Sequence, residues 1–342
     1  MPTYRDFSYT LLCGLALLTG LSLYAPASLS LAPHEAMVLK RASQPLELQL
    51  QSVYSPLYLL LMGIWQQAAT NPLWLRVPGV LCGLLALILG IRVMRQLVGF
   101  HAAPAALLLL AGAPFLVAQA RAISPATMAL ALAMMSYSSF LEYRRAGERV
   151  WLGAWIAISI ISWGVQASLI FLSLVQSAVM LINSGRFNSE KQRWWWVAQI
   201  GVLILFALAF WHPLSHFVTV RLPALTPAQI AEAIPLFALL STNLPLPEAL
   251  PGMLVMLVLG ISGLRAAADW RKNPRHSLLI FGLIAPCPVY LFTPQSEVIL
   301  LCALPCLFGL VAMGLRLYPR WARQGFWAAI ALCYIWSYWH LY

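Results

Sequence analysis

The sequence predicts an all-α polytopic membrane protein that forms a single transmembrane domain over 1–342, and three observations support this. Of the 342 residues, 61% are hydrophobic and 9% are charged, and the mean hydropathy is +0.80. Apolar runs of roughly 20 residues recur along the chain, and each can cross a hydrocarbon core of about 30 Å as a helix. The cations stand in clusters between these runs. Because the runs are continuous and do not alternate with polar residues, they favour helices over barrel strands.

About eleven transmembrane helices are expected. The first covers about 8–27. It ends in an Ala-x-Ala look-alike, but it is longer than the apolar core of a signal peptide, so we interpret it as a retained span. The later spans are expected at about 74–91, 102–119, 125–141, 150–165, 167–183, 194–211, 249–266, 276–293, 297–315 and 324–341.

The positions of the cations predict which loops face the cytoplasm. With a cytoplasmic N-terminus, most of the 21 Lys and Arg residues fall on that side, as the positive-inside rule requires. The clusters are Arg92/Arg95, Arg144/Arg145/Arg149, Arg186/Lys191/Arg193, Arg265/Arg271/Lys272/Arg275 and Arg316/Arg320/Arg323. We therefore expect a multi-pass protein of a bacterial plasma (inner) membrane. The clusters are not interleaved with exposed aromatic residues, so no nucleic-acid partner is expected.

Two long outer loops are predicted, at 28–73 and 212–248. In the first, the apolar piece from Pro56 to about Gln67 is too short to cross comfortably. If it crossed, every later arginine cluster would lie outside, so we expect a re-entrant or juxtamembrane helix on the outer side. In the second, Thr226 followed by Pro227 is a helix start signal, which predicts a short helix against the outer membrane face.

The first outer loop concentrates charge in a chain that has little of it. His34, Glu35, Lys40 and Arg41 stand between two apolar runs. We expect the stretch 34–51 to fold as one or two short amphipathic helices broken near its proline, which lacks a donor and restricts the residue before it. A lone strand here would leave its backbone groups without partners.

Transport and metal chemistry have weaker support in the residues. None of the ten acidic residues is expected in the middle of a span, whereas an ion-coupled transporter normally needs carboxylates there. All six cysteines fall inside apolar runs, where they are expected as small core residues, and no metal site is predicted from them. They are Cys13, Cys82, Cys287, Cys302, Cys306 and Cys333.

An ordered set of short motifs carries a resemblance to a known family. The first outer loop has "HEA" at 34–36 and "SPLY" at 55–58. After them come Arg76-x-Pro78 at the start of a span, the basic pair Arg92/Arg95, then Pro114, Arg121 and Pro125. In this order they resemble the polytopic glycosyltransferases of the protein-O-mannosyltransferase and aminoarabinose-transferase type, which have the GT-C fold. The resemblance covers about residues 8–185 and is faint beyond.

The resemblance implies an inverting transfer of a hexosyl or pentosyl group from a polyprenyl-phosphate donor at the outer membrane face. The acceptor hydroxyl must lose a proton, which a carboxylate in the first outer loop can accept. Cations must stabilise the departing lipid phosphate. Glu35 is the candidate base, with His34 beside it. The candidates for binding substrate and lipid phosphate are Lys40, Arg41, Tyr58, Arg76 and Arg121. The implied partners are membrane lipid and the lipid-linked sugar, and a divalent metal ion stays open as a cofactor.

Two departures from the family pattern support an alternative. His34 stands where the family usually has a first carboxylate, and Ala126 stands where a second acidic residue usually follows. The alternative is a catalytically inactive GT-C homologue that serves as a structural or lipid-binding subunit beside membrane protein partners. Simpler roles are also open for single residues: Glu35 as a helix cap or as a partner of Lys40 or Arg41, and Arg76 as an interfacial anchor.

Overall fold

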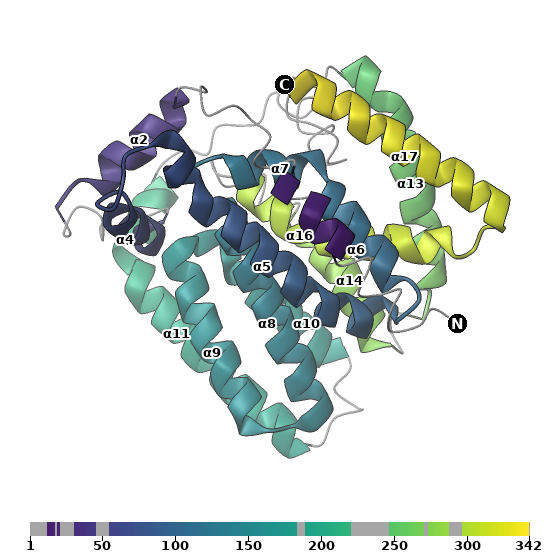
Figure 1. Ribbon diagram of the computed structural model, residues 1–342. Coiled ribbons are helices and arrows are strands. Elements are labelled where there is room, and N and C mark those ends of the chain that lie inside the picture. The colour runs from purple at the N-terminus through teal and green to yellow at the C-terminus, as the bar shows by residue number, and fades with distance from the viewer. Residues whose placement is uncertain are drawn as a thin grey trace.

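The computed structural model describes residues 12–17, 19–20, 31–45, 55–182, 189–219, 246–269, 273–286 and 296–341, and within these ranges every regular element is a helix (Figure 1). The helices are α2 (Pro33–Ala42), α4 (Pro56–Trp65), α5 (Pro72–Val98), α6 (Ala103–Gly112), α7 (Pro114–Arg121), α8 (Ala126–Ala146), α9 (Arg149–Val165), the 3₁₀ turn η1 (Ala167–Leu169), α10 (Ile170–Ile182), α11 (Ser189–Thr219), α13 (Leu246–Ala266), α14 (Pro274–Ile284), α16 (Ser296–Leu315) and α17 (Arg320–Leu341). The all-α prediction is confirmed for this part of the chain.

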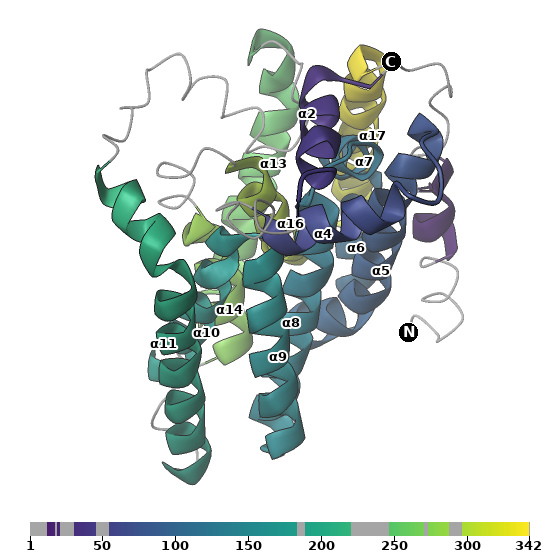
Figure 2. The ribbon, with the colours of Figure 1, turned by 90° about the vertical axis from the view of Figure 1, so that its left-hand side faces the viewer.

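Short helices form in the first predicted outer loop, as expected. Helix α2 occupies the charged stretch, and its last residue, Ala42, lies three residues before Pro45. Helix α4 is the short apolar helix expected after Pro56. Both lie over one end of α8 and α9 (Figure 2). A second helix in the stretch 34–51 is not tested, because residues 46–54 lie outside the described part of the chain.

Helix α5 begins and ends where its sequence provides the signals. The Asn71 side chain accepts a hydrogen bond from the Leu73 backbone N–H at 3.0 Å, and Pro72 takes the first helical position, where its missing N–H has no cost. The helix ends at Val98 and is followed by Gly99, whose φ of 80° lies in the region that glycine adopts without strain.

Pro78 lies inside α5 and has a specific consequence. In a regular helix its N–H would donate to the carbonyl of Trp74, but proline has no N–H. The Trp74 carbonyl instead accepts a hydrogen bond from the Trp65 indole at 2.9 Å, and the two indole rings stack with centroids 4.6 Å apart. The proline therefore exposes an acceptor that ties the end of α4 to the start of α5.

The main core gathers around α16, which packs against α5, α6, α8, α13 and α14. Close approach to α13 depends on glycine. A Cβ atom on Gly263 would lie 2.0 Å from the Leu310 carbonyl oxygen, and one on Gly314 would lie 2.2 Å from that of Leu259. These glycines let two backbones approach as small residues do in membrane helix pairs.

Among the described residues, fewer helices are long and apolar enough to cross a membrane than the sequence predicted. Three described helical segments are long and apolar enough to cross a membrane: Pro72–Val98, Glu190–Ala209 and Val298–Leu315. A fourth is added if the bent pair α6 and α7 is one span. Other expected spans appear as shorter apolar helices, among them α9 and α14, so the count of about eleven is not confirmed.

The expected span at 102–119 shows how proline interrupts an apolar run. Ala113 has an extended backbone (ψ 119°), and α6 and α7 meet there at an angle of 51°. Pro114 restricts the residue before it and cannot continue the hydrogen-bond ladder, so a continuous helix is not available.

Three further expectations are not tested. Most of the first expected span lies outside the described residues, as does the expected helix at Thr226. The orientation in the membrane, with a cytoplasmic N-terminus, stays a prediction.

Candidate functional site

Glu35 is a buried carboxylate on a helix whose other charged residues are exposed. It lies in the first turn of α2 with an exposed fraction of 2%, and its neighbours His34 and Ala36 are exposed. Burying a carboxylate costs free energy unless it is paired and hydrogen-bonded. Glu35 must therefore find its partners within the protein.

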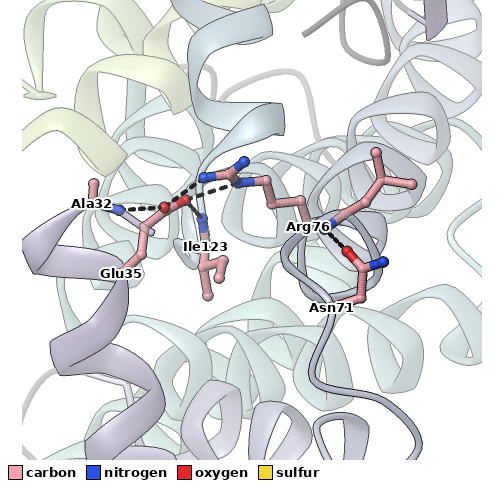
Figure 3. Close-up of polar contacts among 6 residues, drawn as sticks. Ala32, Glu35, Asn71, Arg76 and Ile123 are labelled. Carbon is pink, nitrogen blue, oxygen red and sulfur yellow. Dashed lines mark hydrogen bonds and ion pairs between the residues drawn. The ribbon is translucent and has the colours of Figure 1, made fainter. Parts of the chain in front are cut away.

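Four N–H groups donate to the Glu35 carboxylate (Figure 3). Its Oε1 accepts from the Nε of Arg76 at 3.2 Å and from the backbone N–H of Ile123 at 3.0 Å. Its Oε2 accepts from the Nη2 of Arg76 at 2.8 Å and from the backbone N–H of Ala32 at 2.9 Å. A carboxylate has about four acceptor positions, so all of them are occupied. The Arg76 pair is bidentate, which is the strong geometry for this interaction.

Three segments that are distant in the sequence meet at this carboxylate. Arg76 lies near the start of α5, and Ile123 lies in the turn that follows α7. Gly79 makes the approach of these two segments possible, because a Cβ atom there would lie 2.7 Å from the carbonyl oxygen of Ala120. The close contact between α5 and the end of α7 brings the Ile123 N–H to Glu35.

A small separate core holds α2 and α4 against this point. Its buried members are Ala42, Tyr58, Leu59, Met62, Leu75 and Ile123. Glu35 and Ala42 are seven residues apart and therefore share one face of α2, which is the face turned inward. The site is thus fixed by packing as well as by hydrogen bonds.

The surroundings of Glu35 act on its ionisation in opposite directions. Burial raises the pKa of Glu35, while Arg76 and the backbone N–H groups of Ala32 and Ile123 lower it, and the net effect is a pKa below the ordinary value of 4.5. The carboxylate is therefore ionised at neutral pH.

The other predicted site residues fall into two groups. Tyr58 is buried in the small core, where burial above all, and in part the nearby charge of Glu35, raise the pKa of its hydroxyl. Arg121 is half-buried in the last turn of α7, where a cation suits the helix dipole. His34, Lys40 and Arg41 are exposed on α2. The structure brings Glu35, Arg76 and Tyr58 together, and it does not pair Glu35 with Lys40 or Arg41.

Several groups at and around the site were not predicted from the sequence. The backbone N–H groups of Ala32 and Ile123 have no sequence signature. The roles of Gly79 and Trp65 depend on tertiary contacts, although Pro78 signals a free carbonyl at Trp74. Gln166 follows α9 and accepts a hydrogen bond from Ser55, before α4, at 3.2 Å in a buried position.

The site does not fit a metal ion in the arrangement described. Among the described residues, no group of three or more His, Cys, Asp or Glu side chains could hold one. The acceptor positions of Glu35 are all taken by N–H donors.

Comparisons of sequence found no match for this chain, whereas comparison of structures did. No protein-family model matches the sequence, and no curated protein matches it. The apo oligosaccharyltransferase of Archaeoglobus fulgidus superposes with a TM-score of 0.63 at 11% identity, covering 98% of this chain and 55% of that one. The oligosaccharyltransferase AglB of Archaeoglobus fulgidus, in complex with an inhibitory peptide and a dolichol-phosphate, gives 0.63 at 12% identity, covering 97% and 54%.

A bacterial structure gives a similar match. ArnT from Cupriavidus metallidurans, bound to undecaprenyl phosphate, superposes with a TM-score of 0.61 at 15% identity, covering 94% of this chain and 62% of that one. This chain has a GT-C-type fold. The resemblance found in the sequence motifs is thereby confirmed at the level of the fold. This chain spans between 54% and 62% of the length of the proteins in these three structures, so their activities are not transferred to it by the fold.

Proposed function

We propose that this protein is a membrane glycosyltransferase that moves a sugar from a polyprenyl-phosphate donor to an acceptor at the outer membrane face. The observation that carries the proposal is the ion pair between the buried Glu35, in the first predicted outer loop, and Arg76, near the start of α5, in a GT-C-type fold. Two proteins of similar fold have been solved with a dolichol-phosphate and with undecaprenyl phosphate, and we extend that ligand class to this chain.

The proposed reaction requires two kinds of group. The acceptor oxygen forms a bond to the anomeric carbon while the bond from that carbon to the phosphate oxygen breaks. The acceptor proton needs a base, and the departing phosphate needs cations. A carboxylate and an arginine in contact supply one group of each kind.

Glu35 can act as the base only after it loses one of its donors. The backbone N–H groups of Ala32 and Ile123 are fixed by the chain, whereas the Arg76 side chain is 18% exposed and ends in rotatable bonds. In our proposal the donor phosphate draws Arg76 away from Glu35. The freed carboxylate then accepts the proton of the acceptor hydroxyl. Removal of the arginine also raises the pKa of Glu35, which is the direction that a general base requires.

The remaining predicted residues receive supporting roles in this proposal. Lys40 and Arg41 are exposed on α2 and would contact the donor phosphate. His34, also exposed, would lie beside the acceptor. Tyr58 and Arg121 would shape the site from the small core and from the end of α7.

A transfer assay tests the proposal. Purified protein in liposomes is supplied with polyprenyl-phosphate-linked hexose or pentose, and release of the lipid phosphate is measured. Lys40→Ala combined with Arg41→Ala is expected to raise the KM for the donor about tenfold with an unchanged melting temperature, because both side chains are exposed. Arg316→Ala, a change of an exposed arginine on a different part of the chain, serves as the control and should leave KM unchanged.

Two results would contradict the proposal. If the double variant keeps the parent KM, Lys40 and Arg41 do not contact the donor. If the parent protein transfers no sugar from any of these donors, the inactive homologue with a structural or lipid-binding role becomes the better description.

A further inference from the structure

A basic cavity lies at the opposite end of α5 from Glu35. Its volume is about 670 Å³, and the ends of α5 and α8 and the start of α14 form its walls. Five arginines line it: Arg92, Arg95, Arg144, Arg145 and Arg275. Among the described lining residues, Glu142 is the only carboxylate. The cavity therefore has a large excess of positive charge.

Glu142 neutralises part of this charge. Its Oε1 lies 2.7 Å from the Nη2 of Arg92, and its Oε2 lies 2.7 Å from the Nη2 of Arg145. One carboxylate cannot balance five guanidinium groups. Burial lowers the pKa of Arg144 to about 10, with the nearby charge of Arg275 acting in the same direction, so these two cations repel one another.

Helix stability does not explain why Arg275 is present. It lies in the first turn of α14, directly after Pro274, where the helix dipole disfavours a cation. Two other arginines are held in place by aromatic rings: Arg95 lies over Phe100 at 5.0 Å and Arg92 lies over Trp151 at 5.1 Å. The guanidinium groups are thus partly preorganised around the cavity.

The cavity also meets the apolar outer surface of α5. Ile88 lines the cavity and is 49% exposed. It continues a stripe with Leu81 and Leu85, which are 55% and 43% exposed and lie on the same helical face. In a membrane protein such a stripe faces acyl chains. A ligand with a phosphate in the cavity and a hydrocarbon tail along α5 would satisfy both surfaces.

We propose that this cavity binds a phosphate-bearing anion, with the headgroup of an anionic membrane lipid as its source. Arginine forks match phosphate oxygens in geometry and charge. Basic pockets between membrane helices bind anionic headgroups in this way. The site is separate from Glu35 and does not depend on the proposed transferase activity, so the two proposals fail independently.

Lipid titration of the full-length protein tests this proposal. The protein is stripped of lipid in detergent, and binding of phosphatidylglycerol is followed by native mass spectrometry. Arg144→Gln combined with Arg275→Gln should weaken binding by at least about tenfold, because each basic side chain contributes near an anionic surface. Arg275→Gln alone changes an exposed residue and should weaken binding about threefold to tenfold without affecting folding. The control is Arg265→Gln combined with Arg316→Gln, two exposed arginines outside the lining.

The outcomes separate the sources of phosphate. Tighter binding of phosphatidylglycerol than of zwitterionic phosphatidylcholine, lost in the cavity variants and kept in the control, supports the lipid site. Displacement of the lipid by submillimolar pyrophosphate would support the phosphate site and overturn the lipid as its source. Equal binding in the parent and both cavity variants, or an equal loss in the control, would overturn the proposal.

Discussion

Near each end of helix α5, an arginine of that helix contacts a buried carboxylate from another helix, and the two clusters differ in the other partners of the carboxylate. Arg76 and Arg92 are sixteen positions apart on the helix, or about 24 Å. At the first, Glu35 accepts hydrogen bonds from one arginine and two backbone N–H groups beside the small core. At the second, the described partners of Glu142 are all side chains: Arg92, Arg145 and Gln96.

The two clusters differ in the rigidity of the donors and in the net charge around the carboxylate. Backbone donors cannot turn away, so Glu35 is held by the fold itself. The arginine side chains around Glu142 are 47% and 72% exposed and open onto a cavity lined by further cations. Near Glu35 the carboxylate is saturated with donors, whereas near Glu142 positive charge is left for a ligand. A glutamate–arginine pair thus anchors α2 at one end of α5, and another such pair forms part of the proposed binding surface at the other end.

Removing the charge of Glu35 is expected to have the largest effect on stability. Glu35→Gln replaces a carboxylate oxygen with an NH₂ group, which faces an N–H donor and leaves Arg76 without its partner. We expect the free energy of unfolding to fall by about 3 kcal/mol. Denaturant titration in detergent measures it, and His34→Gln, at the exposed neighbouring position, is the control with no expected change. Equal stability of the Glu35 variant and the parent would show that the pair does not anchor α2.

The expected loss of stability also complicates the use of Glu35→Gln in a transfer assay. A loss of transfer in Glu35→Gln alone does not identify a base, because the variant also disturbs the anchor. Transfer therefore has to be measured below the melting temperature of the variant, at matched folded fractions.

The next largest loss of stability is expected when the close approach of α5 and α7 is disturbed. Gly79→Ala places a Cβ atom 2.7 Å from the Ala120 carbonyl oxygen, and the backbone of α7 must move away from it. We expect a loss of about 1 to 3 kcal/mol. The matched control is Gly153→Ala in α9, where no atom lies within 4 Å of the added Cβ, and a gain of about 0.5 to 1 kcal/mol is expected. Equal melting temperatures for the two variants would show that the Ile123 N–H does not depend on this contact.

Acidification should weaken the anchor at Glu35, because the carboxylate becomes protonated and loses its charge. The folded-state pKa of Glu35 lies below the ordinary value of 4.5, so its contribution to stability is complete above that pH and is lost as the pH falls through the folded pKa. Parent protein should lose stability below about pH 4.5, and Glu35→Gln should lose less over the same interval. Parallel pH profiles for the two proteins would contradict a depressed pKa.

The sequence predicted more of the elements than of their contacts. A short helix in the charged stretch 34–51 and a short apolar helix from Pro56 were both predicted, and both are present as α2 and α4. The suggested pairing of Glu35 with Lys40 or Arg41 did not allow for helix geometry, because residues five and six positions apart lie on different faces. The inward face of α2 was readable from Glu35 and Ala42, seven residues apart.

Other parts of the site were not available from local sequence. Arg76 was singled out by its motif, but its bond to Glu35 joins residues 41 positions apart. The N–H groups of Ala32 and Ile123 are present in every non-proline residue, so nothing in the sequence marks them. The apolar run around Pro114 could have been divided at the proline, since the residue before proline disfavours the helical conformation.

The smallest loss of stability is expected for a change at Glu142. This variant tests the contrast between the two ends of α5 most directly. Glu142→Gln removes the charge from a buried carboxylate, but Arg92 and Arg145 are exposed enough to be solvated without it. A loss of less than about 1 kcal/mol follows, well under that of Glu35→Gln. The positive charge around the cavity rises at the same time, so phosphatidylglycerol should bind the variant more tightly than the parent protein. Native mass spectrometry and denaturant titration of one preparation measure both effects. A stability loss as large as that of Glu35→Gln would mean that Glu142 is a second anchor, and the contrast between the two ends of α5 would then be wrong.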